Sequence, residues 1–326
     1  MVGEYLDRLT RYIPSDNVVL ITDENVSRLY RKQFPHAPVI TIGTGEKIKT
    51  LDTAGEIYQA LLDMDAQRSS FIVGIGGGIV CDITGFIAST YLRGVPFGFV
   101  SSTLLSQVDA SVGGKNGVNF KGFKNMVGVF NQPDFVICDL NLLKTLPQRE
   151  LLCGFAEIVK HAAIEDAGMF DYLEKNNEKA LKLDVDVIEK LVYDSVRIKS
   201  GVVNRDEKEK GERRKLNFGH TFGHAIEKTL GLPHGESVSL GMVMAASLSV
   251  QKGLLSQKDA RRITELLNCY NLPTRIDFDR RQILDALKKD KKRKGDHIHF
   301  VLLNGIGSCL IEDIAIEELD RVMDSL

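Results

Sequence analysis

The feature that most limits the fold is an alternation of β-branched runs and amphipathic stretches in the first 150 residues. Runs with strand character occupy residues 17–23, 38–42, 69–78, 96–102 and 134–140. Segments with apolar residues at helical spacing, such as TLDTAGEIYQALLDM, separate them. Strands that alternate with helices build βαβ units, in which neighbouring strands run parallel. The sequence therefore predicts an α/β domain with a mostly parallel sheet.

The second half of the chain has a different pattern. After TLPQRE (145–150), long helical periodicity extends over residues 151–290, and two β-like runs, HIHFVLL and SCLIEDI, follow. A chain of 326 residues exceeds one ordinary core, since domains average about 150 residues. We expect a boundary near residue 148. Residues 1–148 would form an α/β nucleotide-binding domain and residues 149–326 a mainly helical domain, with the active site in the cleft between them.

Composition excludes several classes of partner. The 42 basic and 44 acidic residues nearly balance, so no global charge attracts nucleic acid or an anionic membrane. The longest apolar run, residues 238–250, is shorter than the roughly 20 residues of a membrane span and suits a buried core helix. Five scattered cysteines without C-x-x-C spacing indicate reduced thiols. With no apolar signal segment at the start, we expect a cytoplasmic protein.

A run of glycines follows the third strand-like run, in FIVGIGGGIVCDITGFIA. Without Cβ atoms, residues 76–78 would let the backbone approach a pyrophosphate at the start of a helix. A tight strand-to-helix turn explains them equally well. Asp82 would meet a cofactor or simply water. Asp23 ends a strand-like run, where an acid can bind a ribose, and Glu46 and Lys49 lie on an expected loop.

The segment STLLSQVDASVGGKNGVNFKGFKN (102–125) is dense in polar groups beside glycines. Asp109 follows an apolar helical stretch, two glycines precede Lys115, and a further glycine turn precedes Lys124 and Asn125. This pattern favours a loop wrapped around a polar, anionic small molecule. An ordinary solvent loop is the alternative, and the apolar helical stretch argues against it.

Glu157 and Lys160 are three residues apart and so share one face of a predicted helix. A surface ion pair is the more common interpretation of such a pair. The neighbours of Glu157 are all apolar, however, and a carboxylate in that setting requires a cation, either Lys160 or a metal.

Three of the seven histidines lie close together in the sequence. His220 and His224, in KLNFGHTFGH, are four residues apart, and spacing alone favours them as a pair of zinc ligands. His234 follows a proline at the start of an apolar helix and, with Glu157, could complete a His/His/Glu site. Core or capping histidines remain the alternative. The basic run at 288–297 is most simply a solvated face.

The motifs, taken in order, closely resemble those of the 3-dehydroquinate synthases, a family of sugar-phosphate cyclases. They extend from about residue 20 to residue 310, and only the ordered set is specific. The matching segments are GGGIVCDITGFIASTYLRG, TLLSQVDASVGGK, KNMVG, TLPQREL, GFAEIVKH, LNFGHTFGHAIE, HGESVSLGM and DKK.

This resemblance implies a Rossmann-like NAD-binding domain followed by a helical domain that binds metal and substrate. The metal would be one divalent ion, zinc or alternatively cobalt. The implied reaction converts 3-deoxy-D-arabino-heptulosonate 7-phosphate (DAHP) to 3-dehydroquinate and phosphate, a step of the shikimate pathway toward aromatic amino acids. NAD would be reduced and reoxidised within each turnover.

The resemblance also implies residue roles. The metal ligands would be Glu157, His220 and His234, which separates His220 from His224. The NAD contacts would be Asp23, Glu46, Lys49, Gly77, Gly78, Asp82, Thr103, Lys115, Lys124 and Thr145. The substrate contacts would be Asp109, Lys115, Asn125, Lys160, Lys199, Arg213, Asn217, His224 and one of the two lysines Lys291 and Lys292. Among these, the catalytic residues would be Lys160, His224, Asp109, Arg213 and Asn217. Arg93 corresponds to an arginine that reaches the neighbouring subunit's substrate, which implies a homodimer.

The chain departs from the family pattern in four places. Its N-terminal strand region is short by about one strand pair, Ser102 replaces a common threonine, Phe123 replaces a common glycine, and the linker before His234 is short. Related cyclases whose substrates lack a carboxylate alter the segment from Arg213 to His224, which here matches the dehydroquinate pattern. The alternatives are another sugar-phosphate cyclase, an NAD-dependent, metal-containing polyol or alcohol dehydrogenase, and a non-enzymatic metal- or nucleotide-binding module.

Overall fold

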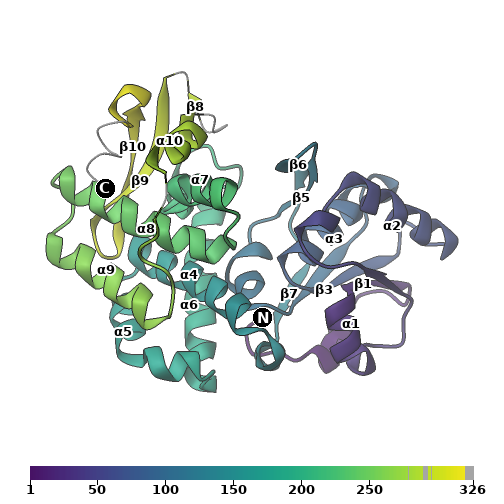
Figure 1. The fold of residues 1–326 in the computed structure, drawn as a ribbon. Coiled ribbons are helices and arrows are strands. Elements are labelled where there is room, and N and C mark those ends of the chain that lie inside the picture. Colours follow the sequence, from purple (N-terminus) through teal and green to yellow (C-terminus); the bar gives the residue numbers. More distant parts are fainter. Residues whose placement is uncertain (278, 289–292, 295, 320–326) are drawn as a thin grey trace. The chain divides into compact units, whose positions relative to one another are not determined.

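The computed structural model describes residues 1–277, 279–288, 293–294 and 296–319 (Figure 1). The chain divides into two compact units, Met1–Pro147 and Gln148–Leu326. The first unit combines a parallel sheet with helices, and the second is mainly helical. The fold class predicted from the sequence is therefore confirmed.

Five parallel strands form the sheet of the first unit. They are β1 (Val18–Asp23), β2 (Val39–Ile42), β3 (Phe71–Gly76), β4 (Phe97–Ser101) and β7 (Phe135–Cys138), in the order β2-β1-β3-β4-β7. Each lies inside one of the predicted runs. Along β1, Val19 and Ile21 join one apolar core while Leu20 joins another. Because both faces of the sheet are covered, its strands are continuous apolar runs.

Helices cover this sheet, and short helical turns connect its elements. The helices are α1 (Glu24–Tyr30), α2 (Leu51–Asp63) and α3 (Gly78–Thr90). The short turns are η1 (Leu6–Arg11), η2 (Arg31–Gln33), η3 (Glu46–Ile48), η4 (Tyr91–Arg93), η5 (Ser106–Ala110) and η6 (Leu140–Thr145). In α2, Ala54, Ile57 and Leu61 are spaced three and four apart and are all buried, so one apolar stripe attaches the helix to the core.

The prediction of a loop over residues 102–125 is wrong for its second half. Strands β5 (Lys115–Phe120) and β6 (Phe123–Phe130) form an antiparallel hairpin there. The two turn residues, Lys121 and Gly122, both have positive φ, 47° and 79°, which suits the tight turn of a hairpin. Most of β6 is exposed, so the alternation of buried and exposed residues that would reveal a strand is missing.

The second unit contains seven long helices within its described residues, and a small sheet. The helices are α4 (Gln148–Glu165), α5 (Ala167–Leu181), α6 (Val185–Arg205), α7 (His220–Leu230), α8 (His234–Gln251), α9 (Gln257–Cys269) and α10 (Arg280–Lys288), with the short η7 (Glu212–Asn217) before α7. The sheet has the order β10-β9-β8 and consists of β8 (Arg293–Lys294), β9 (His297–Gly305) and β10 (Ser308–Ala315). Strands β9 and β10 are the two β-like runs expected near the end of the chain.

Helix α8 is the buried core helix predicted from the apolar run at 238–250. Val238, Met242 and Leu248 have exposed fractions of 0–1%. Among the described residues, no helix combines the length and the hydropathy that crossing a membrane requires.

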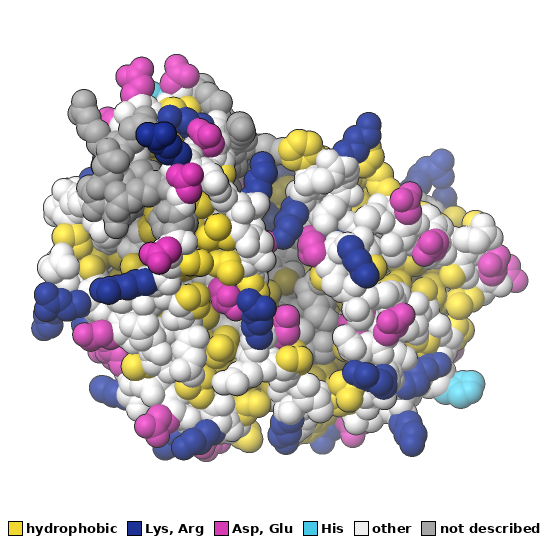
Figure 2. All heavy atoms as spheres, in the orientation of Figure 1, with side chains coloured by type: hydrophobic (Ala, Val, Ile, Leu, Met, Phe, Trp, Pro, Cys, Tyr) yellow, Lys and Arg dark blue, Asp and Glu magenta, His cyan; other side chains and the backbone are white. Residues whose placement is uncertain are grey.

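The surface charge and the state of the cysteines agree with the predictions made from the sequence. Figure 2 shows acidic and basic side chains interspersed over the visible surface, as the balanced composition predicts. The five cysteines, all within the described residues, are free thiols. Burial raises the pKa of the Cys153 thiol to about 11 and that of Cys309 to about 12, so these two thiols resist ionisation and oxidation near neutral pH.

Candidate active-site residues

Three helices of the second unit bring Glu157, His220 and His234 together. Glu157 lies in the middle of α4, while His220 and His234 are the first residues of α7 and α8. One ligand atom of each residue lies within 4.8 Å of the others. The glutamate side chain is fully buried, with 0% exposed. Two imidazoles and a carboxylate at this separation are a donor set that zinc accepts.

Both imidazoles present the same nitrogen to Glu157. Nε2 of His234 lies 3.2 Å from Oε1 of Glu157, and Nε2 of His220 lies 3.5 Å from the same oxygen. The opposite ring nitrogen of His220 is 3.1 Å from the carbonyl oxygen of Phe218, and that of His234 is 3.5 Å from Oε2 of Glu227. A partner at Nδ1 fixes the orientation of the ring and leaves Nε2 available to a metal.

The surroundings shift the pKa values of the two histidines in opposite directions. Burial holds the pKa of His220 well below its usual range, and the Lys160 ammonium lowers it further. For His234, burial also lowers the pKa, but the carboxylates of Glu157 and Glu227 outweigh burial and raise the pKa to about 9. A neutral imidazole such as His220 is ready to coordinate, whereas His234 would release a proton when it binds a metal.

Glycines allow the three helices to approach closely enough for this cluster. A Cβ atom on Gly235, next to His234, would lie 2.3 Å from Cα of Cys153 on α4. A Cβ atom on Gly241 would lie 2.0 Å from the carbonyl oxygen of Gly219, which precedes α7. Any larger residue would force α8 away from α4 or α7, and the histidines would move away from Glu157.

His224 lies beside this cluster. Its ring centroid is 5.3 Å from that of His220 and 6.4 Å from that of His234. It is exposed, and its ring groups with Glu227 and His234 within 4.8 Å. Glu227 is not among the site residues predicted from the sequence. Its position, three residues after His224 on the same helical face, is the signal that would have revealed it.

Lys160 forms an ion pair with Glu157 through Oε2, and both side chains are at least 98% buried. The interpretation of these two residues as a surface ion pair is therefore wrong. The apolar residues around Glu157 in the sequence reflect the core position of α4, and the ammonium compensates for burial of the carboxylate.

Three further candidate substrate residues lie in the same unit. Lys199 is buried on α6, and Arg213 has an exposed fraction of only 2%. The Arg213 guanidinium donates to the carbonyl oxygen of Glu207, and the side-chain amide of Asn217 donates to Oε1 of Glu209 at 2.7 Å. Glu209 is not among the site residues predicted from the sequence, because nothing in its local spacing distinguishes it.

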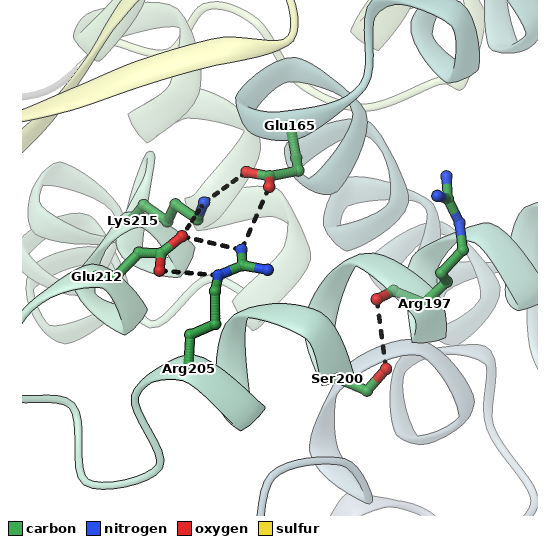
Figure 3. A network of polar contacts seen from close by, with 6 residues as sticks. All are labelled: Glu165, Arg197, Ser200, Arg205, Glu212 and Lys215. Atoms are coloured by element: carbon green, nitrogen blue, oxygen red, sulfur yellow. Dashed lines mark hydrogen bonds and ion pairs between the residues drawn. The ribbon is translucent and has the colours of Figure 1, made fainter.

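An ion-pair network surrounds the segment that carries Arg213 and Asn217 (Figure 3). The guanidinium of Arg205 donates to both oxygens of Glu212, each at 2.9 Å. Lys215 donates to Glu212 at 2.8 Å and to Glu165, at the end of α4, at 2.6 Å. The network thus ties η7 to the ends of α6 and α4.

In the first unit, candidate residues follow two central strands. The chain passes from β1 to the edge strand β2 and then returns to β3 on the other side of β1. Ligands of open α/β sheets bind where the strand order reverses in this way, at the carboxyl ends of the strands. Asp23 ends β1, and residues 76–78 connect β3 to α3. Burial raises the pKa of Asp23, although the backbone N–H of Val26 donates to its carboxylate and opposes the rise.

The glycine run has a packing role. A Cβ atom on Gly76 would lie 2.5 Å from Val80, and one on Gly78 would lie 2.9 Å from Ala110. The strand-to-helix turn therefore requires these glycines. Gly77 is the N-cap of α3 and, as a glycine, has no side chain that could cap the helix start. A helix N-terminus of this kind can accept an anion.

Lys49 connects two other candidates. Its buried ammonium contacts the carboxylate of Asp82 on α3 and the side-chain oxygen of Asn125 on β6. Asn119 on β5 supports this arrangement, because its amide donates to Glu46 at 2.8 Å and its oxygen accepts from the backbone N–H of Asn125 at 2.8 Å. The structure thus brings Glu46, Lys49, Asp82 and Asn125 together.

The remaining candidates of the first unit are spread over several elements. Asp109 is in η5, Lys115 begins β5, and Lys124 is exposed on β6. Thr103 donates to Ser106 at 3.0 Å, and the hydroxyls of Thr145 and Tyr30 lie 2.6 Å apart. Arg93 is exposed in a turn where Leu92, Arg93 and Gly94 all have positive φ, 49°, 69° and 119°. Lys291 and Lys292 lie outside the described residues.

Comparison with known proteins shows the family of this chain. The family described as 3-dehydroquinate synthase N-terminal matches residues 39–153, and 3-dehydroquinate synthase C-terminal matches residues 154–293. The 3-dehydroquinate synthase of Dehalococcoides mccartyi (strain ATCC BAA-2266 / KCTC 15142 / 195) is 42% identical over 96% of this chain and 90% of its own length.

Two solved structures of related enzymes share the fold. One is 2-deoxy-scyllo-inosose synthase complexed with carbaglucose-6-phosphate, NAD+ and Co2+, with 27% identity, a TM-score of 0.89, and 98% of this chain and 95% of that chain covered. The other is 2-epi-5-epi-valiolone synthase from Streptomyces hygroscopicus subsp. jinggangensis 5008 with NAD+ and Zn2+ bound, with 26% identity, a TM-score of 0.87, and 95% and 90% covered. By its matches along nearly the whole sequence, the chain belongs to the 3-dehydroquinate synthase family.

Proposed function

We propose that the chain is an NAD- and metal-dependent lyase that converts DAHP to 3-dehydroquinate and phosphate. The observation that carries this proposal is the convergence of Nε2 of His220 and Nε2 of His234 on the buried carboxylate of Glu157. The family to which the chain belongs supports the same activity.

The three donors fit a divalent metal ion, zinc or alternatively cobalt. Their separation, burial and chemistry agree with a site of three protein ligands that leaves one position open. A bound ion would polarise substrate hydroxyl groups and lower their pKa. Lys160 would hold a positive charge beside Glu157, and His224, at the rim of the cluster, would contact the substrate phosphate.

NAD fits the carboxyl edge of the sheet in the first unit. The start of α3 at Gly77 and Gly78 offers backbone N–H groups to a pyrophosphate, and Asp23 offers a carboxylate to a ribose. Glu46, Lys49, Asp82, Thr103, Lys115, Lys124 and Thr145 complete the proposed NAD contacts. Bound NAD would oxidise a substrate alcohol transiently, so that phosphate can leave, and would restore it afterwards without net redox change.

The proposed substrate contacts divide by the group that they recognise. Arg213 and Lys199 are buried cations suited to the carboxylate, Arg213 in bidentate geometry. Lys115, Asn125 and His224 would hold the phosphate, together with Lys291 or Lys292. Asp109, Lys160 and Asn217 would contact the hydroxyl groups and ring atoms that react.

We further propose a homodimer in which Arg93 reaches the substrate of the neighbouring subunit. The exposure of Arg93 in this turn supports the proposal, because an exposed arginine is accessible to a neighbouring subunit. Free, mostly buried cysteines support the cytoplasmic location expected from the sequence.

Phosphate release from DAHP tests the function directly. Purified protein with NAD and zinc should release phosphate from DAHP while the NADH level stays constant. Phosphate release should stop when a chelator removes the metal. Net NADH production from a simple polyol, without phosphate release from DAHP, would instead identify a dehydrogenase. No turnover of DAHP under these conditions would contradict the proposal.

A further inference from the structure

The segment 206–217 carries two proposed substrate contacts, Arg213 and Asn217. Its first residue, Asp206, accepts hydrogen bonds from later residues of the same segment. The Asp206 carboxylate accepts three backbone hydrogen bonds: from Lys210 at 2.9 Å, from Gly211 at 2.7 Å and from Arg213 at 3.0 Å. The backbone N–H of Asp206 bonds to the last turn of α6, at the carbonyl oxygens of Val202 and Val203. Asp206 therefore fastens the segment to the end of α6.

The hydrogen bonds that reach Asp206 use both carboxylate oxygens. The N–H of Lys210 donates to Oδ1, while those of Gly211 and Arg213 donate to Oδ2. These bonds hold the pKa of Asp206 below its usual value, so the group is an anion that only accepts. An asparagine has one acceptor oxygen and would place an amide donor against one set of N–H groups.

The hydrogen bond from the backbone N–H of Arg213 links Asp206 to a residue that we propose binds the substrate carboxylate. Arg213 is 98% buried, since its exposed fraction is 2%, although its neighbours Gly211 and Glu212 are exposed. Its backbone is fixed by Asp206 and its guanidinium by the carbonyl oxygen of Glu207. Lys199, the other proposed carboxylate contact, lies on α6, the helix to which Asp206 fastens the segment.

The ion pairs in Figure 3 hold the outer side of the same segment. Arg205, directly before Asp206, grips Glu212, directly before Arg213, through two hydrogen bonds of 2.9 Å. These groups are partly exposed, with 51% and 40% of their side chains accessible, so water screens the pair and weakens it. The backbone bonds to Asp206 are the more specific restraint, because they act on the residue that carries the guanidinium.

From this geometry we propose that Asp206 is a positioning residue that sets Arg213 for the substrate carboxylate before the substrate binds. The inference rests on the proposed function, because it takes Arg213 as the carboxylate contact. Order in the unbound protein reduces the entropy lost on binding, so the anchor affects affinity more than the chemical step. Asp206 itself touches no substrate in this proposal.

The test compares Asp206→Asn with a matched control, Asp166→Asn. Asp166 also accepts a backbone N–H, from Met169 at 2.9 Å, but it caps α5 rather than the segment 206–217. With DAHP, Asp206→Asn should raise KM about tenfold or more and lower kcat less than threefold, while Asp166→Asn should leave KM within twofold. The inference would be overturned if KM of Asp206→Asn stayed within twofold of the unsubstituted protein. It would also be overturned if both variants showed the same rise in KM and the same fall in kcat.

Amide hydrogen exchange supplies a reading that needs no substrate. The backbone amides of Lys210, Gly211 and Arg213 should exchange faster in Asp206→Asn than in the unsubstituted protein. Their exchange rates should be unchanged in Asp166→Asn. Unchanged exchange in both variants would overturn the inference even if DAHP is the substrate. Absence of DAHP turnover in the unsubstituted protein would contradict the proposed function instead. If Asp206→Asn does not fold, Asp206→Glu keeps the charge with a longer side chain and should raise KM in the same way.

Discussion

Nε2 of His234 lies 3.2 Å from Oε1 of Glu157, although 77 residues separate the two in the sequence. His220 presents its own Nε2 to the same oxygen at 3.5 Å. Two imidazoles that face one carboxylate oxygen, each with a partner at Nδ1, have their metal-binding nitrogens already oriented. The cluster therefore gives the most direct tests of the proposed chemistry.

We predict that His220→Ala and Glu157→Ala each abolish tight zinc binding, because each removes one of three protein ligands. Competition with a chromophoric chelator would measure this, and phosphate release from DAHP should fall in parallel. His297→Ala, at an exposed histidine of the same unit, serves as the control and should bind zinc normally. Phosphate release unaffected by either cluster variant would sink the metal assignment.

His224→Ala should keep the metal and lose activity. His224 is exposed beside the cluster, and we assign it to the substrate phosphate. Metal content and chelator competition should match the unsubstituted protein while KM for DAHP rises. A loss of zinc equal to that of His220→Ala would show that His224 is a ligand.

Glu227→Gln should weaken zinc binding by roughly 10- to 100-fold, the usual effect of removing the partner of a metal-bound histidine. The carboxylate of Glu227 faces Nδ1 of His234 at 3.5 Å, and an uncharged amide would support that ring less well. Glu236→Gln is the matched control, since Glu236 lies on α8 near His234 but pairs with Arg149 at 2.6 Å. Equal zinc affinities in the two variants would contradict this role.

Arg213→Lys should weaken DAHP binding while preserving the charge. A lysine cannot donate in bidentate fashion, and a hydrogen bond to a charged group contributes about 1.5–3 kcal/mol, or on the order of 10- to 100-fold in affinity. Calorimetric titration with DAHP would measure the change. An unchanged dissociation constant would count against Arg213 as the carboxylate contact.

Glu212 should make the protein sensitive to acid. Hydrogen bonds from Arg205 and then from Lys215 lower the pKa of Glu212 from 4.5 to about 2. As pH falls, Glu212 is therefore protonated at a higher pH in the unfolded chain than in the folded chain. The stabilisation is fully present above about pH 4.5 and disappears as pH approaches 2.

Urea unfolding of Glu212→Gln between pH 2 and 7 tests this dependence. The difference in unfolding free energy from the unsubstituted protein should be constant above about pH 4.5 and shrink toward zero near pH 2. Glu178→Gln replaces an exposed glutamate of the same unit and controls for the substitution itself. A difference that does not change with pH would refute the prediction.

Several parts of the site lay beyond what local sequence could predict. The hairpin β5–β6 was hidden because most of β6 is exposed, so no alternation of apolar and polar residues marks it. The Glu157–Lys160 pair could be placed on one helical face, but not in the core, because burial depends on the helices that pack against α4. Spacing alone also favoured His220 with His224, which are one turn apart, over His220 with the distant His234.

The sequence by itself determined the elements that depend on neighbouring residues. The five parallel strands follow from β-branched runs, and the buried helix α8 follows from a long, mostly apolar stretch without charged residues. Tertiary structure alone decided which side chains meet. Gly235 and Gly241 let α8 approach Cys153 on α4 and Gly219 before α7, and this close packing brings His234 and His220 to Glu157. Local periodicity carries no information about such contacts, because they depend on the distance between helix axes.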